Sequence, residues 1–147
     1  MKRLFALLLV SLFAVGSLSA AEAVWLTNYD QALKQAAAEK KPVLIDFTGS
    51  DWCGWCIRLD KEVFSQQEFV DYAAANLVLL KLDFPQKKEQ SAAEKAQNEK
   101  LAKKYQIEGF PTIVVLNAAG KQIGELGYEK GGATKWIASL EKVTKKP

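Results

Sequence analysis

Residues 42–47 (PVLIDF) form a short apolar run, rich in β-branched residues and entered through a proline. Such a run predicts a buried strand. A Gly-Ser-Asp turn at residues 49–51 follows, and residues 56–64 (CIRLDKEVF) then place apolar side chains at roughly helical spacing. A buried strand that leads through a tight turn directly into a helix favours an α/β fold over an all-helical or all-strand one.

The rest of the chain continues this alternation of helix and strand. Helical spacing predicts helices over residues 28–41, 91–105 and 134–143, and apolar runs predict strands over residues 76–84, 111–117 and 121–128. The turn at residues 118–120 is short, so the last two strands are expected to form an antiparallel hairpin. Residues 85–90 read as a polar loop. The chain has 147 residues, with no internal repeat and no linker, which predicts one folded domain.

The only two cysteines, Cys53 and Cys56, lie where the first strand ends and the helix begins. Unpaired backbone N–H groups at a helix start carry partial positive charge and lower the pKa of a thiol there. A lower pKa yields more of the nucleophilic thiolate and a better leaving group, which favours thiol–disulfide exchange. The placement of the pair is more informative than the Cys-x-x-Cys spacing alone.

Three other uses of the cysteine pair are disfavoured. A structural disulfide closing a loop of four residues would stabilise the fold by only about 2 kcal/mol in the entropic model. A structural zinc site needs four ligands, usually cysteine and histidine, and this chain has no histidine. Copper carriers of the Met-x-Cys-x-x-Cys type have methionine where this chain has Asp51. We therefore expect no metal and no organic cofactor.

The N-terminus predicts a cleavable signal peptide at residues 1–20, with cleavage between residues 20 and 23. Lys2 and Arg3 precede an apolar segment at residues 4–15, and small residues follow it. An uncleaved anchor is the alternative, but the apolar segment is shorter than the roughly 20 residues that cross a bilayer. Residues 24–147 would then be the mature, exported, periplasmic domain. The net charge of +3, without a basic stripe, gives no reason to expect nucleic acid.

Three segments in order resemble the thioredoxin family: LIDFTGSDWCGWC, LLKLDF and GFPTIVVLNAAGKQIGELGY. The resemblance covers essentially all of residues 24–147. It implies a thioredoxin-like fold, with a central mixed sheet flanked by helices. More narrowly, the secretory signal and the DWCGWC and DFP segments are similar to exported bacterial thioredoxin-like disulfide reductases.

The resemblance also implies roles for individual residues. Cys53 would be the exposed attacking thiolate and Cys56 the more buried resolving thiol. Asp46 would be a buried acid that moves the proton of Cys56, accompanied by Lys81. The residues implied to line the substrate groove are Trp52, Trp55, Phe110, Pro111 in a cis-proline loop, and Gly127.

Each of these residues also has a plainer interpretation. Asp46 could face the surface at a strand end, and Lys81 could point to solvent. Trp52 and Trp55 could serve packing alone. Pro111 could be a trans proline at a strand start, and Gly127 a bulge or turn residue.

Departures from the family pattern bear on the direction of electron flow. One extra residue separates Asp46 from Cys53 compared with ordinary thioredoxin. Strong oxidants and isomerases often carry histidine between the cysteines, where its charge stabilises the thiolate; this chain has Gly54 and Trp55 there, and Asp51 nearby. A less stabilised thiolate means a more reducing couple, which favours a reductase.

The sequence thus predicts a monomeric protein-disulfide reductase that acts on disulfide-containing exported proteins. The resemblance implies a membrane-embedded electron donor. Two alternatives remain: an oxidase or isomerase that uses the same site, and a non-catalytic binding module built on the same fold.

Overall fold

The computed structural model describes residues 22–145, so the signal peptide expected at residues 1–20 lies outside the described residues. Within this range, five strands form one sheet in the order β1-β3-β2-β4-β5. The strands are β1 (Trp25–Leu26), β2 (Val43–Thr48), β3 (Val78–Asp83), β4 (Thr112–Leu116) and β5 (Gln122–Leu126). Strand β3 runs parallel to both β1 and β2, whereas β4 runs antiparallel to β2 and β5. The expected mixed sheet and its hairpin are confirmed.

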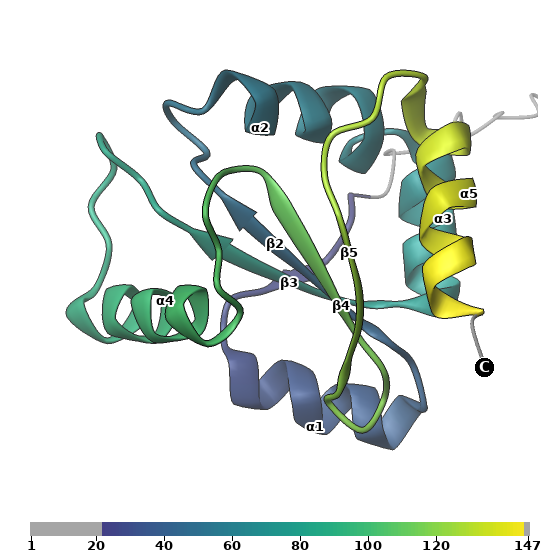
Figure 1. The fold of residues 1–147 in the computed structure, drawn as a ribbon, viewed down its shortest axis with the longest axis horizontal. Helices are drawn as coiled ribbons and strands as arrows, with labels where there is room; N and C mark the ends of the chain where they lie inside the picture. Colours follow the sequence, from purple (N-terminus) through teal and green to yellow (C-terminus); the bar gives the residue numbers. More distant parts are fainter. Residues whose placement is uncertain (1–21, 146–147) are drawn as a thin grey trace, which may run out of the picture.

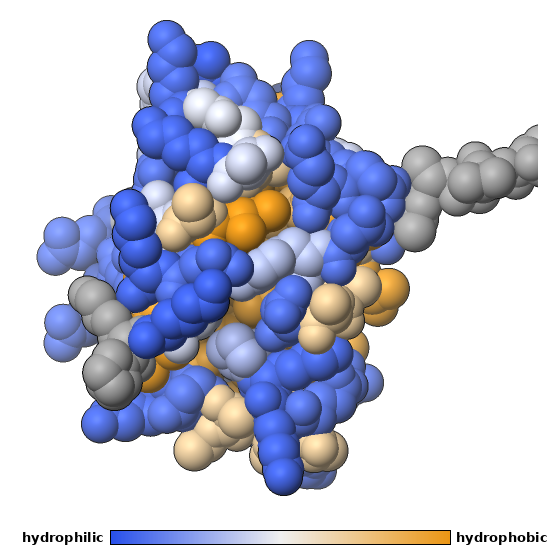
Figure 2. Space-filling view, turned by 90° about the vertical axis from the view of Figure 1, so that its right-hand side faces the viewer, coloured by the Kyte–Doolittle hydropathy of each residue, from blue (hydrophilic) through white to orange (hydrophobic). Residues whose placement is uncertain are grey.

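Helices cover both faces of the sheet (Figure 1). On one face lie α1 (Tyr29–Glu39) and α4 (Ala92–Lys104). On the other lie α2 (Gly54–Leu59), the π-helical turn η1 (Asp60–Phe64), α3 (Gln67–Asn76) and α5 (Gly132–Thr144). None of these helices, within residues 22–145, is long and apolar enough to cross a membrane. The outer face over α3 and α5 is largely hydrophilic, with apolar side chains visible only in patches (Figure 2).

The alternation of side chains along β2 decides what lies beneath the cysteines. Val43, Ile45 and Phe47 are buried against the α1 and α4 layer. Leu44 is buried in the opposite core, together with Leu59 of α2 and with residues of η1, α3 and α5. Because successive side chains of a strand point to opposite faces, Asp46 points to the layer that contains α2 and η1.

Two elements were not predicted from the sequence, namely β1 and α3. Strand β1 has two residues, too few to show an alternating pattern. Helix α3 buries only Phe69, Val70 and Ala73, so its apolar stripe is narrow. The predicted helix at residues 56–64 is present, but its second half is π-helical, with the Ser65 amide donating to the Asp60 carbonyl over 2.8 Å.

Candidate redox site

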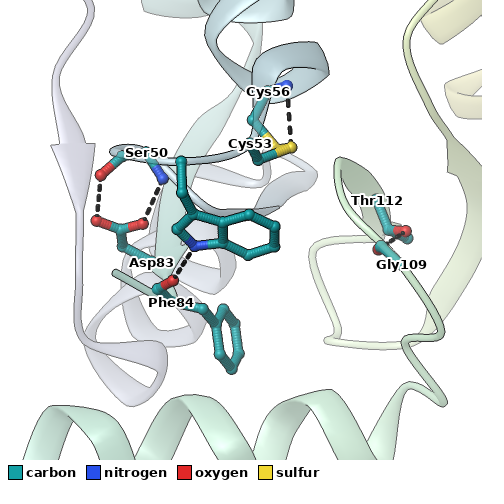
Figure 3. The surroundings of a disulfide bond; sticks show 8 residues. Ser50, Cys53, Cys56, Asp83, Phe84, Gly109 and Thr112 are labelled. Atoms are coloured by element: carbon teal, nitrogen blue, oxygen red, sulfur yellow. Dashed lines mark hydrogen bonds between the residues drawn. A yellow bond between two sulfur atoms is a disulfide. The ribbon is translucent and has the colours of Figure 1, made fainter. Parts of the chain in front are cut away.

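Cys53 and Cys56 form a disulfide at the start of α2. The Cys53 amide donates to the carbonyl of Gly49 over 2.9 Å, which fixes the turn after β2. Cys53 is the N-cap of α2, and its Sγ accepts a hydrogen bond from the Cys56 amide at 3.2 Å (Figure 3). The expected position at the junction of strand and helix is therefore confirmed. This amide is one of the unpaired donors at a helix start that can stabilise a thiolate.

The expected exposure of Cys53 is wrong for the oxidised structure. Cys53 is 7% exposed and Cys56 is 4% exposed, so both are buried and the first is only slightly more accessible. The reason is the N-cap geometry, because the Cys53 side chain folds back over the first turn of α2 to meet the Cys56 amide. A reaction partner can therefore reach the Cys53 sulfur only through the small part of this residue that is exposed.

Asp46 is buried, with 4% of its surface exposed, and its Oδ1 has no hydrogen-bond partner among the described residues. The alternative of a surface-facing strand end is therefore wrong. The pKa of Asp46 is raised to about 7, mainly by burial; Lys81 opposes the shift, and the nearby Asp60 and Asp83 add to it. A carboxyl group with such a pKa exchanges its proton near neutral pH.

Lys81 lies beside Asp46 in the sheet register but forms its ion pair with another acid. Its Nζ is 3.6 Å from Asp60 Oδ1 and 4.9 Å from the centre of the Trp25 ring. The side chain is 29% exposed, so it is neither fully buried nor simply directed to solvent. A hollow of about 290 Å³ lined in part by Lys81, Asp60 and Cys56 opens here. Solvent can therefore approach the site from this side.

The turn before the cysteines is hydrogen-bonded to the last residue of β3. Ser50 donates to the Asp83 carboxylate from its amide over 2.9 Å and from its hydroxyl over 2.5 Å (Figure 3). The added residue in the 49–51 turn is thus held by two hydrogen bonds to a charged acceptor, which are stronger than bonds to neutral groups.

Trp52 is 40% exposed but firmly placed. Its indole Nε1 donates to the carbonyl of Phe84 over 2.7 Å, and its ring meets that of Phe110 edge-on, with centroids 5.9 Å apart. The Phe110–Pro111 peptide bond is cis, as the resemblance implied, so the trans alternative is wrong. The contact between Trp52 and Phe110 brings this cis-proline segment next to the redox turn.

Trp55 lies in a second cluster on α2. It is 56% exposed, and its ring lies 5.1 Å from that of Tyr128, with the guanidinium of Arg58 near both rings. Arg58 pairs with Glu62 at 2.6 Å, and the Tyr128 hydroxyl donates to the same carboxylate at 2.6 Å. Trp52 and Trp55 thus both pack against neighbours and keep open ring surface beside the disulfide.

Gly127 follows β5, and its carbonyl accepts a hydrogen bond from the indole of Trp136 at 2.9 Å. A Cβ added there would meet the Pro111 carbonyl at 3.9 Å, an ordinary contact. A side chain at position 127 would therefore fit without a clash, and the place of Gly127 on the substrate surface stays a prediction.

Within residues 22–145, no group of three or more histidine, cysteine, aspartate and glutamate side chains is arranged to hold a metal ion.

The model for a thioredoxin-like domain matches residues 29–144, most of the described chain. The chain belongs to the thioredoxin-like family. It is 34% identical over 128 residues to the disulfide bond reductase DsbH of Chlamydia pneumoniae, covering 87% of this chain and 76% of that protein. It also superposes on a solved structure described as DsbH oxidoreductase, with a TM-score of 0.82, 33% identity, and 94% and 95% of the two chains covered.

Longer members of the same group also match. The thioredoxin-related protein DsbJ of Chlamydia pneumoniae is 30% identical over 138 residues, which is 88% of this chain and 39% of that protein. The thiol:disulfide interchange protein DsbD of Ralstonia nicotianae is 29% identical over 80% of this chain but only 18% of its own length. With its Cys53–Cys56 pair, this thioredoxin-like protein is a thiol–disulfide oxidoreductase of the Dsb type.

Sequence reasoning missed several residues around the site, notably Asp60, Asp83 and Tyr128. A signal existed for Asp60, because it lies four residues after Cys56 and so on the same side of a helix. Asp83 and Tyr128 carry no comparable signal, since they reach the site only through the packing of β3 and of the segment after β5.

Proposed function

We propose that this protein is an exported protein-disulfide reductase. The observation that carries the proposal is the environment of the Cys53 sulfur. This sulfur accepts a hydrogen bond from the Cys56 amide but has no histidine beside it. The cations of Arg58 and Lys81 are paired with Glu62 and Asp60. A thiolate without a dedicated cation is less stabilised, which makes the dithiol a better reductant. The likeness to a protein named disulfide bond reductase supports the same direction.

The reaction begins with the reduced dithiol. The Cys53 thiolate attacks one sulfur of a client disulfide, forming a mixed disulfide and releasing the other client sulfur as a thiolate that takes up a proton. Cys56 gives its proton to Asp46, and its thiolate attacks Cys53 Sγ. The second client sulfur leaves as a thiolate and is protonated. Two electrons pass from the protein to the client, and the Cys53–Cys56 disulfide seen in the structure is the product.

Asp46 suits the proposed proton transfer because its pKa of about 7 lets it accept and return a proton near neutral pH. Trp52, Trp55, Phe110 and Pro111 would contact the client segment that carries the disulfide. Open aromatic surface of this kind favours apolar, unfolded segments over charged ones.

The oxidised protein must be reduced again before the next turnover. We infer a membrane-embedded electron donor, since export would separate this protein from soluble nicotinamide-dependent reductases. The similarity to part of DsbD shows only that the same domain type occurs in larger interchange proteins. Monomeric behaviour and the signal peptide at residues 1–20 remain predictions.

A dithiothreitol-driven insulin reduction assay on the domain at residues 24–147 tests this proposal. The wild type is expected to accelerate precipitation of the insulin B chain, and Cys53→Ser is expected not to. An isomerase is the second candidate, because a structure described as a putative disulphide-isomerase from Bacteroides thetaiotaomicron matches with a TM-score of 0.67 and 27% identity. Efficient reshuffling of a scrambled disulfide protein, without insulin reduction, would favour that candidate and contradict the reductase.

A further inference from the structure

The carboxylate of Asp51 accepts hydrogen bonds from the backbone of the loop between β3 and α4. Its Oδ1 accepts the Gln86 amide at 3.0 Å, and its Oδ2 accepts the amides of Lys87 at 2.7 Å and Lys88 at 2.9 Å. Three successive N–H groups that converge on one carboxylate form a small anion-binding concavity. These bonds lower the pKa of Asp51, so the group stays ionised. The loop is thus attached to the residue that lies two positions before Cys53.

Neighbours of Asp51 contact the same part of the chain. Ser50 bonds to Asp83, and the Trp52 indole bonds to the carbonyl of Phe84. Residues 50, 51 and 52 therefore each hydrogen-bond to a different part of residues 83–88. The far end of the loop has a separate attachment, where the side chains of Gln90 and Asn98 donate to the Asp83 carbonyl at 3.0 and 2.9 Å.

The attached segment carries an aromatic ring of the client-facing surface. The ring of Phe84 lies 5.0 Å from that of Phe110, which in turn meets Trp52 at 5.9 Å. Three rings from three separate parts of the chain thus form one wall, hereafter the aromatic wall, between the redox turn and the cis-proline segment. All three rings keep part of their surface exposed. The position of this wall depends on how residues 84–88 sit against the redox turn.

We propose that Asp51 is a positioning residue for client binding. By gathering the amides of residues 86–88, it holds the Phe84 segment against the redox turn and keeps the aromatic wall preformed for a polypeptide client. A preformed surface binds more tightly because less freedom is lost on binding. This inference rests on the proposed function, since it concerns the proteins whose disulfides Cys53 attacks.

A different role for Asp51 would be electrostatic. Its negative charge near Cys53 could disfavour the thiolate and so make the couple more reducing. That role requires the charge alone, whereas the positioning role requires the hydrogen-bond acceptors. Asp51→Asn separates the two, because it removes the charge but keeps one oxygen that can accept the two amides now bound to Oδ2.

The experiment uses stopped-flow oxidation of the reduced domain by insulin, with hydroxyethyl disulfide as a small substrate that does not need the aromatic wall. For Asp51→Ala, the half-saturating insulin concentration is expected to rise about tenfold, with a much smaller change in the limiting rate. The rate with hydroxyethyl disulfide is expected to change less than the insulin efficiency does. Asp51→Asn is expected to fall between Asp51→Ala and the wild type.

Hydrogen exchange supplies a readout that does not depend on activity. The amide protons of Gln86, Lys87 and Lys88 are expected to be protected in the wild type and to lose protection in Asp51→Ala. Glu89→Ala is the matched control, because Glu89 is an exposed carboxylate of the same loop with no hydrogen bond or ion pair among the described residues. Glu89→Ala is expected to match the wild type in its half-saturating insulin concentration, its rate with hydroxyethyl disulfide and its amide protection.

Several outcomes would overturn the inference. One is an unchanged half-saturating insulin concentration in Asp51→Ala. Another is an equal loss with insulin and hydroxyethyl disulfide, and a third is an Asp51→Asn variant as impaired as Asp51→Ala. Failure of the proposed function would look different, because the wild type itself would not reduce insulin, while the exchange of residues 86–88 would still report on the contact.

Discussion

The ammonium of Lys81 pairs with the carboxylate of Asp60, 3.6 Å away, although Lys81 lies beside Asp46 in the sheet. Among residues 22–145, Asp46 is therefore left buried without a direct ionic partner, and its Oδ1 has no hydrogen bond. Isolated burial of a carboxylate is costly unless the group is neutral, so the site stabilises the protonated form of Asp46. This arrangement links the proposed proton transfer to a measurable property of the whole protein, its stability as a function of pH.

Replacing Asp46 with asparagine is expected to stabilise the oxidised protein at high pH and to change it little at low pH. The pKa of Asp46 is raised to about 7 in the folded state, so the folded state binds a proton that the unfolded state releases near pH 4. Stability is therefore lost as pH rises from about 4 to about 7, by about 4 kcal/mol for a shift of about three units. Asparagine is neutral at every pH and is as unpartnered as the protonated acid, so Asp46→Asn avoids most of this loss at high pH.

Urea unfolding of the oxidised wild type and variant at pH 5 and pH 8 measures this effect. Asp30→Asn, at an exposed carboxylate in α1, is the control and is expected to show little difference between the two pH values. An equal effect of Asp46→Asn at both pH values would mean that Asp46 is not protonated near neutral pH.

The two cysteines are expected to behave differently when each is replaced by serine. Cys53→Ser should abolish disulfide reduction, because the first attack is lost. Cys56→Ser should accumulate mixed disulfides with client proteins, because attack still occurs and release does not. Non-reducing electrophoresis of the variants after incubation with a disulfide-containing client distinguishes the two. Trapping by Cys53→Ser instead would reverse the assignment of the nucleophile.

The tryptophans beside the disulfide are expected to report its redox state. Trp52 and Trp55 flank the sulfurs in sequence and keep exposed ring surface, so their emission should change when dithiothreitol reduces the bond. Far-ultraviolet circular dichroism should change little. The double variant Trp52→Phe with Trp55→Phe retains Trp25 and Trp136 and should lose the response. An emission spectrum of the wild type that is indifferent to dithiothreitol would contradict this expectation.

Local sequence patterns predicted most of the fold, and the reasons are physical. The apolar runs that became β2, β3 and β4 are buried on both faces, so their strand character is visible without knowledge of their neighbours. The start of the helix at Cys53 followed from the turn before it. Strand β1 and helix α3 were missed because their few buried side chains owe their burial to the packing of the whole domain.

The site was predictable only in part. The burial of Asp46 follows from its place within an apolar strand. The pairing of Lys81 with Asp60 and not with Asp46 depends on side-chain directions that no spacing encodes. The partners of Asp51 are backbone amides 35 to 37 residues away, and backbone amides leave no mark in a sequence. The buried state of Cys53 likewise arises from how its side chain turns over α2.

The redox potential of the Cys53–Cys56 couple tests the central claim most directly. A strong oxidant of this kind lies near about −120 mV and thioredoxin near about −270 mV, a gap of about 7 kcal/mol for two electrons. One pKa unit at Cys53 accounts for only about 1.4 kcal/mol. The missing histidine therefore lowers the redox potential only part of the way from that of the strong oxidant to that of thioredoxin. Equilibration of the domain with reduced and oxidised glutathione, followed by quantification of free thiols, measures the potential. We predict a value closer to that of thioredoxin than to that of the strong oxidant, whereas a value above about −180 mV, the range of protein disulfide isomerase, would contradict the reductase.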